Sequence, residues 1–552
     1  MLRRNIYKYL LSSLILIIFS GFFSGRNDVY FEINKNIDLF GKIYKDVTFN
    51  YVDNIDPEEF MRAGIRGMLG SLDPYTFFID ENKKEDFDLI TNGKYGGVGI
   101  SIGIRGEKVT IIDVLDGYSA QKQGLRVGDV LIEAAGGKIT PDNADEISSL
   151  VKGNPGTIVN LKVLRNESRD TLSFNLIREE VQVKSLAYYG FCPPKSNNAY
   201  LKLINFSRSA GDEVINALKE LKSKKEIKSV VLDLRSNPGG LLDVAVNICE
   251  NFLPKNDLIV STKGRDETSN KSYSSTQEPL LSGVKLIVLI NENSASASEI
   301  VAGAIQDHDR GIIMGTKSFG KGLVQTITPL DFNTSLKITT ARYYTPSGRC
   351  IQKIDYADHN KAISEIDTVV KSSFFTEHRR LVYGAGGITP DTSVQALLES
   401  DIVKDLLSKG LFFQFADHYY YMHPNDKYSL LSNDNLYSDF ENYLTEQKYK
   451  FHSTAEEQIN RILSQMEGKN SGKNIIEGLS KLKKEFEKLD SDELKANKNE
   501  VDNEIRIELS SRYNGNYIKT EESLNNDLQF QTALRILSDS YIYNKLLNLN
   551  KK

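Results

Sequence analysis

The sequence predicts an α+β multidomain protein built from a helical N-terminal domain, a β-rich module, an α/β core and a helical C-terminal tail. Three observations lead to this class. The chain of 552 residues is too long for a single ordinary core. Apolar residues recur at helical spacing near both ends of the chain. Between the ends, short β-rich runs are followed by alternating strand and helix patterns.

Residues 1–25 have the layout of an export signal. Three basic side chains lie in the first eight residues, and an apolar stretch over residues 10–23 follows them. Two phenylalanines interrupt the small residues at 20–25, so no good cleavage site for a signal peptidase is evident. A cleaved signal peptide and a retained, rather short membrane anchor both remain open. Either predicts an exported protein, in the periplasm or anchored to the inner membrane and facing the periplasm.

Two predicted domains follow this segment. Residues 28–85 alternate apolar and charged residues at helical spacing and end in Leu72-Asp73-Pro74-Tyr75, where Pro74 closes a helix. Residues 86–180 instead contain short β-rich runs, such as 109–112 and 159–163, separated by glycine turns. The sequence therefore predicts a small helical domain and then a compact β-rich module.

The remainder divides into a core and a tail. Within residues 181–395, expected strands alternate with expected helices, which predicts an α/β core with parallel strands. The strands are expected over 230–234, 284–290 and 312–315, and the helices over 241–253 and 297–306. Residues 396–552 show helical periodicity, as in 475–489, but contain no catalytic motif. We therefore expect a helical C-terminal extension, and the sequence does not indicate its role.

Composition excludes several classes of function. Lys and Arg number 69 against 74 Asp and Glu, so the net charge of −5 provides no basic footprint for nucleic acid. Three widely spaced cysteines, Cys192, Cys249 and Cys350, match no zinc pattern and cannot form a full disulfide framework. Neither a P-loop nor a cluster of metal ligands is evident. We therefore expect no metal and no cofactor.

Ser296 lies where a strand turns into a helix. The expected strand 284–290 runs into Ser294-Ala295-Ser296-Ala297-Ser298-Glu299, after which apolar residues recur at helical spacing. Such a turn suits a nucleophile, because unpaired N–H groups at the start of the helix can stabilise an oxyanion. The alternative is structural, since Ser296 with Glu299 three residues later also forms a capping box.

A serine nucleophile needs a base, and histidine is poorly placed to supply it. His308 is nearest in sequence, but twelve residues along the same helix place it about 18 Å away. The G-x-S-x-G elbow of α/β-hydrolases is also missing. Gly320-Lys321-Gly322, before the expected strand 323–327, offers a lysine base, and its glycines allow a tight turn. The alternative is a solvated lysine in a turn.

Two further loops have backbone N–H groups that could bind an anion. Asp233-Leu234-Arg235-Ser236-Asn237-Pro238-Gly239-Gly240 follows an apolar strand and opens a helix. One of its glycine N–H groups could complete an oxyanion hole beside Ser296 if the two strands are neighbours, although a plain turn has the same composition. In the β-rich module, Gly97-Val98-Gly99-Ile100 begins a strand whose first N–H groups could bind a peptide carboxylate. There, too, a structural turn is the alternative.

Together these segments resemble the C-terminal processing peptidases, or tail-specific proteases, a serine/lysine family with an embedded PDZ domain. The tail after about residue 400 lies outside the shared motifs. The resemblance rests on Ser71 to Tyr75, Gly124 to Leu131, Asp233 to Gly240, Ser294 to Glu299, Phe319 to Gln325, Ala341 to Gly348 and Gly386 to Asp391.

The resemblance implies a PDZ domain at 86–180 and a crotonase-like serine protease core at 181–395. The interval of 25 residues between Ser296 and Lys321 matches the family and favours Ser296 over Ser294 and Ser298. The resemblance implies that Ser296 is the nucleophile, that Lys321 is its base and that Gln325 holds Lys321. It implies the N–H groups of Ala297 and Gly239 as oxyanion donors, with Gly240 less favoured. The binding loop for a peptide C-terminus would be formed by Gly97, Val98, Gly99 and Ile100.

The predicted function is therefore a serine endopeptidase that recognises free C-termini and cleaves exported proteins through an acyl-enzyme. Its partners would be proteins or peptides with free C-termini, and self-association is left open. Lys321 should act as a neutral amine, with a pKa below the ordinary value of about 10.4. The alternatives are a non-catalytic PDZ scaffold, a hydratase or hydrolase acting on acyl-CoA, and a tricorn-like or retinoid-binding relative.

Overall fold

The computed structural model describes residues 29–81, 93–165, 171–354, 356, 372–423, 435–466 and 472–549. The predicted export segment, residues 1–25, lies outside them. Across these ranges, no helix is both long enough and apolar enough to cross a bilayer. The chain divides into two compact units. The first comprises Met1–Asp80, Gln325–Thr339 and Tyr356–Ala362, and the second comprises the rest.

The first unit is mainly helical, as expected. It contains a helix over residues 29–50, α2 (Pro57–Gly70) and the short strand β1 (Phe77–Ile79). The Asp56 carboxylate caps α2 by accepting the N–H of Glu58 at 2.8 Å. The sequence did not predict β1, because three residues are too few to reveal a period. β1 pairs antiparallel with the start of β18 (Ser335–Tyr344).

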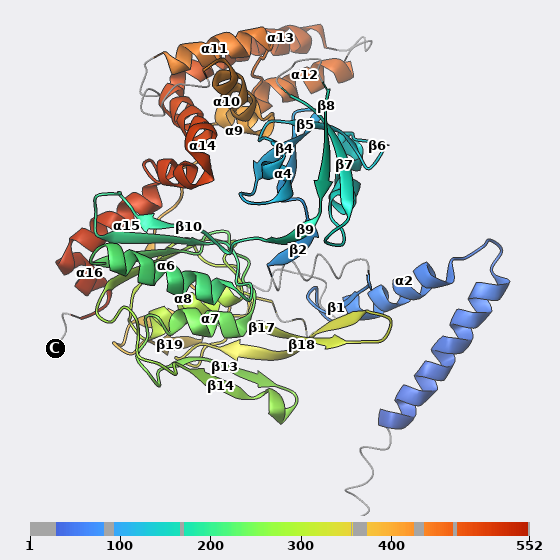
Figure 1. The fold of residues 1–552 in the computed structure, drawn as a ribbon, viewed down its shortest axis with the longest axis vertical. Helices are drawn as coiled ribbons and strands as arrows, with labels where there is room; N and C mark the ends of the chain where they lie inside the picture. Colours follow the sequence, from blue (N-terminus) through green and yellow to red (C-terminus); the bar gives the residue numbers. More distant parts are fainter. Residues whose placement is uncertain are drawn as a thin grey trace, which may run out of the picture. The chain divides into compact units, whose positions relative to one another are not determined.

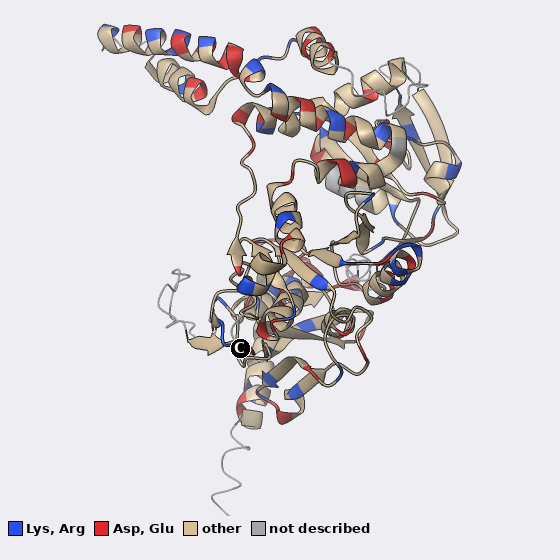
Figure 2. Ribbon diagram, turned by 90° about the vertical axis from the view of Figure 1, so that its left-hand side faces the viewer, with Lys and Arg blue, Asp and Glu red and all other residues tan. Residues whose placement is uncertain are grey.

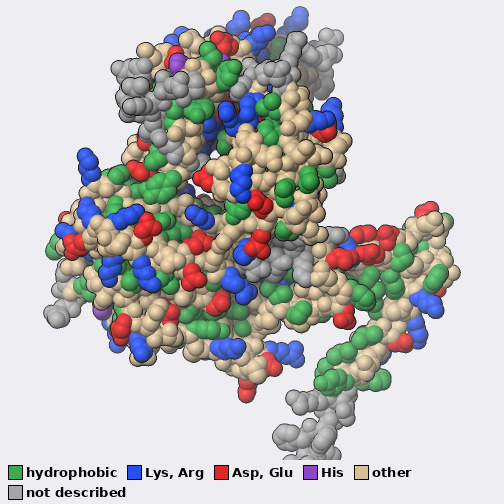
Figure 3. Space-filling model, in the orientation of Figure 1, with side chains coloured by type: hydrophobic (Ala, Val, Ile, Leu, Met, Phe, Trp, Pro, Cys, Tyr) green, Lys and Arg blue, Asp and Glu red, His purple; other side chains and the backbone are tan. Residues whose placement is uncertain are grey.

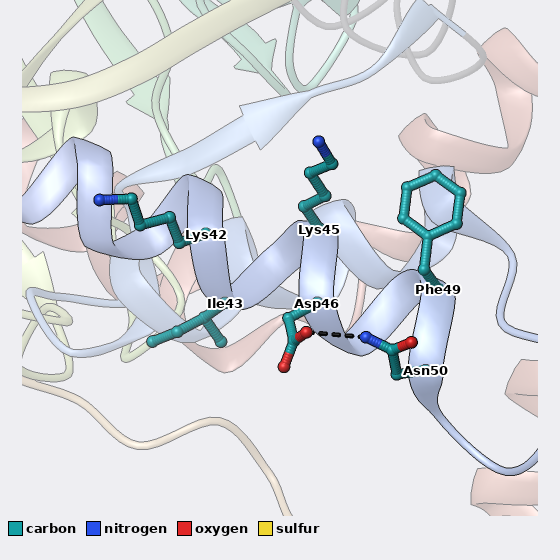
Figure 4. Close-up of a pocket in the computed structure, with 6 residues that line it drawn as sticks. All are labelled: Lys42, Ile43, Lys45, Asp46, Phe49 and Asn50. Carbon is teal, nitrogen blue, oxygen red and sulfur yellow. Dashed lines mark hydrogen bonds between the residues drawn. The ribbon is translucent and has the colours of Figure 1, made fainter.

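The helix over residues 29–50 exposes many large apolar side chains. Tyr30, Phe31 and Phe49 are each more than half exposed, and apolar groups cover much of this helix in Figure 3. A shallow hollow along it is lined from this helix by Lys42, Ile43, Lys45, Asp46, Phe49 and Asn50, and the Asn50 amide donates to Asp46 at 2.7 Å (Figure 4). None of the predicted site residues lines this hollow.

In the second unit, the β-rich module forms a six-stranded sheet in the order β3-β4-β5-β7-β8, with β6 paired to β5. The pairings are antiparallel, and β3, at one edge, pairs within this sheet with β4. The elements of the whole module, of which β2 and β9 lie outside this sheet, are β2 (Lys94–Gly97), β3 (Ile100–Arg105), β4 (Lys108–Val114), α4 (Ser119–Lys122), β5 (Val130–Ala134), β6 (Gly137–Lys138), α5 (Ala144–Val151), β7 (Ile158–Leu164), β8 (Thr171–Ile177) and β9 (Glu179–Gln182).

The α/β core is built on a six-stranded sheet in the order β10-β11-β12-β15-β16-β21. All neighbouring pairs are parallel except β10 with β11, which confirms the predicted parallel core. The strands are β10 (Leu186–Phe191), β11 (Asn198–Leu203), β12 (Ser229–Asp233), β15 (Lys285–Ile290), β16 (Ile312–Gly315) and β21 (Thr392–Ser393), and the helices are α6 (Ala210–Lys224), α7 (Leu242–Cys249) and α8 (Ala297–Asp307).

Short strands complete the second unit. β13 (Leu258–Gly264) pairs antiparallel with β14 (Lys271–Ser274) and with the end of β18. β19 (Ser373–Phe375) and β20 (Leu381–Tyr383) form a hairpin. β17 (Leu323–Pro329) and β18 pass from one unit to the other.

Both faces of the core sheet are buried, but by different parts of the chain (Figure 1). Leu232 and Val288 pack with helices α6, α7 and α8. Their neighbours Val231 and Ile287 face the opposite way and pack with residues of α15 (Leu528–Ser538) and α16 (Ser540–Leu546). Burial on both faces explains why these strands read as continuous apolar runs. The sequence left the role of the tail open, and its last two helices complete the α/β core.

Truncating a side chain in this second layer should therefore destabilise the core. Leu537 in α15 is 5% exposed, so we expect Leu537→Ala to lower the free energy of unfolding by about 2–5 kcal/mol. Leu482→Ala is the matched control. Leu482 is 42% exposed, so its truncation should lower the free energy of unfolding by less than about 0.5 kcal/mol. Denaturant unfolding of both variants tests the comparison, and equal losses would contradict the packing.

The rest of the tail has its own core, formed by residues of α9, α10, α11 and α14. Aromatic rings dominate it: Phe412 stacks on Phe440 with centroids 5.1 Å apart. Basic and acidic residues are interspersed along the ribbon in Figure 2, in keeping with the balanced composition. These helices are α9 (Asp401–Ser408), α10 (Leu411–Met422), α11 (Leu436–Glu446), α12 (Thr454–Met466), α13 (Lys473–Ala496) and α14 (Lys498–Ser523).

Candidate active site

The two loops singled out in the sequence lie side by side. β12 and β15 are adjacent parallel strands, with Asp233 opposite Leu289, so the loops that follow them leave the same edge of the sheet. The carbonyl of Asn237 in the first loop accepts the N–H of Ala295 at 3.0 Å and the hydroxyl of Ser298 at 2.9 Å. The expected proximity of the two loops is therefore confirmed.

Ser296 occupies a strained turn immediately before α8. Its φ of 56° and ψ of −113° are uncommon for a residue with a side chain. Such strain costs on the order of 1–3 kcal/mol and concentrates at functional sites. A sharp strand-to-helix turn of this kind holds the nucleophile of α/β-hydrolases. This sharp turn is not evident in the sequence, because alanines and serines, rather than glycines, flank Ser296.

The structure distinguishes the three serines that composition could not. Ser294 and Ser298 are fully buried. The Ser294 hydroxyl donates to the Leu234 carbonyl at 2.8 Å, and the Ser298 hydroxyl is likewise used to join the two loops. Ser296 is only partly buried. It is therefore the serine of the three that a substrate can reach.

Gly239 lies directly beside Ser296. A Cβ at Gly239 would lie 2.8 Å from the Ser296 Cβ and 2.9 Å from the Ala297 nitrogen, so a larger residue would collide with the turn. Among the described residues, none accepts the Ala297 N–H, which leaves this donor for an oxyanion. The Gly239 N–H donates to Asn237 Oδ1 at 2.9 Å, so it would have to leave that acceptor before it could also bind the oxyanion.

Lys321 lies between two tightly packed glycines, two residues before β17. A Cβ at Gly320 would lie 2.8 Å from the Lys353 Cβ, and one at Gly322 would lie 2.8 Å from the Gln352 nitrogen. A side chain larger than glycine would therefore collide with its surroundings at either position. Lys321 is half-buried, and its backbone N–H donates to Glu299 Oε2 at 2.9 Å.

Glu299 joins the turn of Ser296 to the segment of Lys321. Burial raises the pKa of Glu299 to about 7, and the hydrogen bonds that its carboxylate accepts oppose this rise. The Ser296 N–H donates to Oε2 at 2.8 Å, which is the part of the capping box that involves the Glu299 side chain. The capping pattern was visible in the sequence, but the contact with Lys321, 22 residues further on, was not.

Two other residues considered in the sequence have different surroundings. The Gln325 amide, in β17, donates to Thr339 Oγ1 at 3.4 Å. Its predicted role of holding Lys321 stays a prediction. His308 caps the far end of α8, and its Nε2 lies 2.7 Å from the Leu258 carbonyl oxygen.

The Gly97 to Ile100 loop connects β2 to the edge strand β3. The carbonyl oxygens of Val98 and Gly99 accept the N–H groups of Ala120 at 3.0 Å and Leu115 at 2.9 Å. No described residue accepts the N–H of Val98 or Gly99. Gly99 has a φ of 81°, and a Cβ there would lie 2.5 Å from the Tyr118 Cβ. The loop thus offers N–H donors beside a strand edge.

Comparison with known families agrees with this architecture. Residues 197–360 match the family described as peptidase family S41, and residues 96–176 match a PDZ domain. Residues 402–537 match the C-terminal helical domain of probable PDZ-proteases. The tail, which lay outside the motifs recognised in the sequence, is therefore also a family domain.

The chain is 39% identical over 323 residues to the carboxy-terminal-processing protease of Bartonella bacilliformis, covering 58% of this chain and 73% of that protein. The chain belongs to the carboxy-terminal processing proteases. It is also 27% identical over 385 residues to the carboxy-terminal processing protease CtpB of Bacillus subtilis, covering 69% and 76% of the two chains. A solved photosystem II D1 C-terminal processing protease is 26% identical, covers 64% of this chain and 85% of its own, and has a TM-score of 0.34.

This carboxy-terminal processing protease is thus a serine peptidase of family S41 with a PDZ domain, acting on protein substrates. The alternative of a non-catalytic PDZ scaffold is not supported.

Proposed function

We propose that this peptidase cleaves exported proteins near their C-termini, with Ser296 as nucleophile and Lys321 as general base. The observation that carries the proposal is the turn at Ser296. It combines a strained backbone, a partly exposed serine and an Ala297 N–H with no acceptor among the described residues. Strain and an unpaired donor are what a nucleophile and its oxyanion hole require.

Acylation begins with attack of Ser296 Oγ on the carbonyl carbon of the scissile bond, while the hydroxyl proton passes to Lys321 Nζ. The Ala297 N–H stabilises the resulting oxyanion, joined by the Gly239 N–H once it leaves Asn237 Oδ1. When the C–N bond breaks, the Lys321 ammonium returns its proton to the leaving amine. The products are an ester on Ser296 and a free C-terminal fragment.

Deacylation uses the same groups. Lys321, neutral again, takes a proton from water, and the resulting hydroxide attacks the ester carbonyl. Collapse of the second tetrahedral intermediate returns the proton to Ser296 Oγ and releases the new carboxylate. Gln325 would keep the neutral amine oriented without adding charge. In this mechanism Lys321 and the backbone N–H groups do the work, and no step uses a metal or a cofactor.

Substrate selection is assigned to the PDZ domain. The N–H groups at Val98, Gly99 and Ile100 would bind the terminal carboxylate, and the preceding residues of the substrate would add to the edge of β3 as a strand. Main-chain hydrogen bonds along β3 provide affinity, and side-chain pockets provide selectivity. The predicted export signal at residues 1–25 supports a location in the periplasm, or at the inner membrane facing it.

Amidation of a substrate's C-terminus should lower kcat/KM by about tenfold or more. The amide removes the negative charge, and charge-assisted hydrogen bonds are roughly twice as strong as neutral ones. The measurement compares one cleaved peptide with its amidated form, and a peptide amidated only on an internal Glu or Asp side chain is the control. Equal kcat/KM for the free and amidated peptides would remove the carboxylate from the proposal.

The biological side of the proposal has a direct test. C-terminal peptides of the exported proteome are compared between cells with the wild-type protein and cells with Ser296→Ala. We expect a set of exported proteins to retain longer C-termini in the variant cells. Identical C-termini in both would rule out C-terminal processing of exported proteins as the physiological role.

A further inference from the structure

Two buried side chains contact the backbone of both Ser296 and Lys321. Glu299 Oε2 accepts the N–H of Ser296 at 2.8 Å and the N–H of Lys321 at 2.9 Å. The Tyr343 hydroxyl lies 3.1 Å from the carbonyl oxygen of Ser296 and 2.5 Å from that of Lys321. One side chain therefore engages the two N–H groups, and the other engages the two carbonyl groups.

The second carboxylate oxygen of Glu299 is also fully used. Oε1 accepts the Ser318 hydroxyl at 2.6 Å and the Gly320 N–H at 2.8 Å. Each oxygen thus faces two donors, and three of the four donors are backbone N–H groups that cannot reverse their role. An ionised carboxylate, which only accepts, satisfies all four. A side-chain amide cannot, because its NH₂ group would face at least one backbone N–H.

These contacts lie in a dry part of the protein. Glu299 is fully buried and Tyr343 is 1% exposed. Tyr343 is held in turn, because its own N–H donates to the Gly322 carbonyl at 3.0 Å. Hydrogen bonds away from water are stronger than exposed ones, and leaving any of them unmade is costly. The arrangement is therefore rigid at the point where two distant chain segments meet.

We propose that Glu299 and Tyr343 are positioning residues that together set the distance and orientation between Ser296 and Lys321. This inference rests on the proposed function, because it takes Ser296 and Lys321 as the reacting pair. Ser296 and Lys321 come from different elements. Ser296 lies at the start of α8, and Lys321 lies in the segment before β17. Proton transfer between them depends on placement, and an error of about 1 Å can cost on the order of 100-fold in rate.

Glu299→Gln and Tyr343→Phe test the two sides separately. Glu299→Gln keeps the shape but turns one acceptor into a donor, so we expect kcat to fall about 100-fold. Tyr343→Phe keeps the buried ring and removes only the hydroxyl, so we expect a fall of about tenfold. Because both side chains are buried away from the surface that a substrate can reach, KM and the affinity of the PDZ domain for a C-terminal peptide should stay within about twofold.

Matched controls exist elsewhere in the core. Glu250 is 7% exposed and accepts the N–H and hydroxyl of Thr276, both at 2.7 Å. Tyr543 is 5% exposed, and its hydroxyl lies 2.9 Å from the nitrogen and 3.1 Å from the oxygen of Leu286. Glu250→Gln and Tyr543→Phe should therefore disturb similar buried hydrogen bonds while leaving kcat nearly unchanged.

The substrate is a quenched fluorescent peptide with a free C-terminus, selected from a peptide library as one that the wild-type enzyme cleaves. Steady-state kinetics on this peptide gives kcat and KM for all four variants and for Ser296→Ala. A folded Glu299→Gln or Tyr343→Phe enzyme with wild-type kcat overturns the inference while Ser296→Ala remains inactive. Losses of equal size in the controls also overturn it, since they would reflect general damage to the core. Turnover by Ser296→Ala would instead overturn the proposed function. If Glu299→Gln fails to fold, Tyr343→Phe decides the question.

Discussion

Replacing Ser296 by alanine is expected to abolish peptide cleavage while leaving the fold and the binding of C-terminal peptides intact. Loss of a nucleophile in a catalytic unit lowers kcat by roughly 10⁴- to 10⁶-fold. The structural cost should be limited to that of a helix cap, about 0.5–2 kcal/mol, because Ser296 lies at the cap position of α8. Turnover, thermal unfolding and peptide affinity of the purified variant measure these effects separately.

The neighbouring serines provide the controls for this variant. Ser294→Ala and Ser298→Ala each remove a buried hydrogen bond between the two loops, which should cost about 1 kcal/mol of stability. Both enzymes should still cleave peptides. Ordinary turnover by Ser296→Ala, or its loss only in one of the control variants, would move the nucleophile to another residue.

Lys321→Arg should be inactive although it preserves the positive charge. A guanidinium stays protonated at any accessible pH and cannot accept the proton of Ser296. Lys321→Ala should lose as much activity as Ser296→Ala, because members of a catalytic unit are strongly non-additive. Single-turnover cleavage by the folded variants measures the loss. A Lys321→Arg enzyme with a substantial fraction of wild-type kcat would show that the lysine is a turn residue and that another base acts.

The pH dependence of the wild-type enzyme complements these variants. If Lys321 acts as a neutral amine, kcat/KM should rise with pH through a group that titrates clearly below about 10.4. Glu299 contributes in the same direction, since its pKa is raised to about 7 by burial. Below that pH its carboxylate gains a proton and loses an acceptor. A profile that falls between pH 6 and 9 would contradict both roles.

The sequence predicted the elements of the core well because they are buried on both faces. The expected strand 312–315 agrees with β16 (Ile312–Gly315), and the expected helix 297–306 differs from α8 (Ala297–Asp307) by one residue. Continuous apolar strands between amphipathic helices produce an unambiguous pattern. The same patterns placed Ser296 at its turn and predicted that the two loops meet if their strands are neighbours, as β12 and β15 are.

Features that depend on contacts between distant segments could not be predicted from local patterns. The helical period of α15 reveals an apolar face, but not that this face covers β12 and β15. The spacing of Ser296 and Glu299 indicates a cap, but not that the carboxylate continues to Gly320 and Lys321. Strain at Ser296 was hidden for a different reason, since its flanking residues are small without being glycines.

Covalent labelling with a serine-directed sulfonyl fluoride, followed by mass-spectrometric mapping of the modified residue, identifies the nucleophile of this protease. We expect a single adduct on Ser296, slowed strongly by Lys321→Ala and absent from Ser296→Ala, while Ser294→Ala and Ser298→Ala enzymes still label. An adduct on Ser294 or Ser298 in the wild-type protein, or undiminished labelling of Ser296→Ala, would contradict the assignment of Ser296 as the nucleophile.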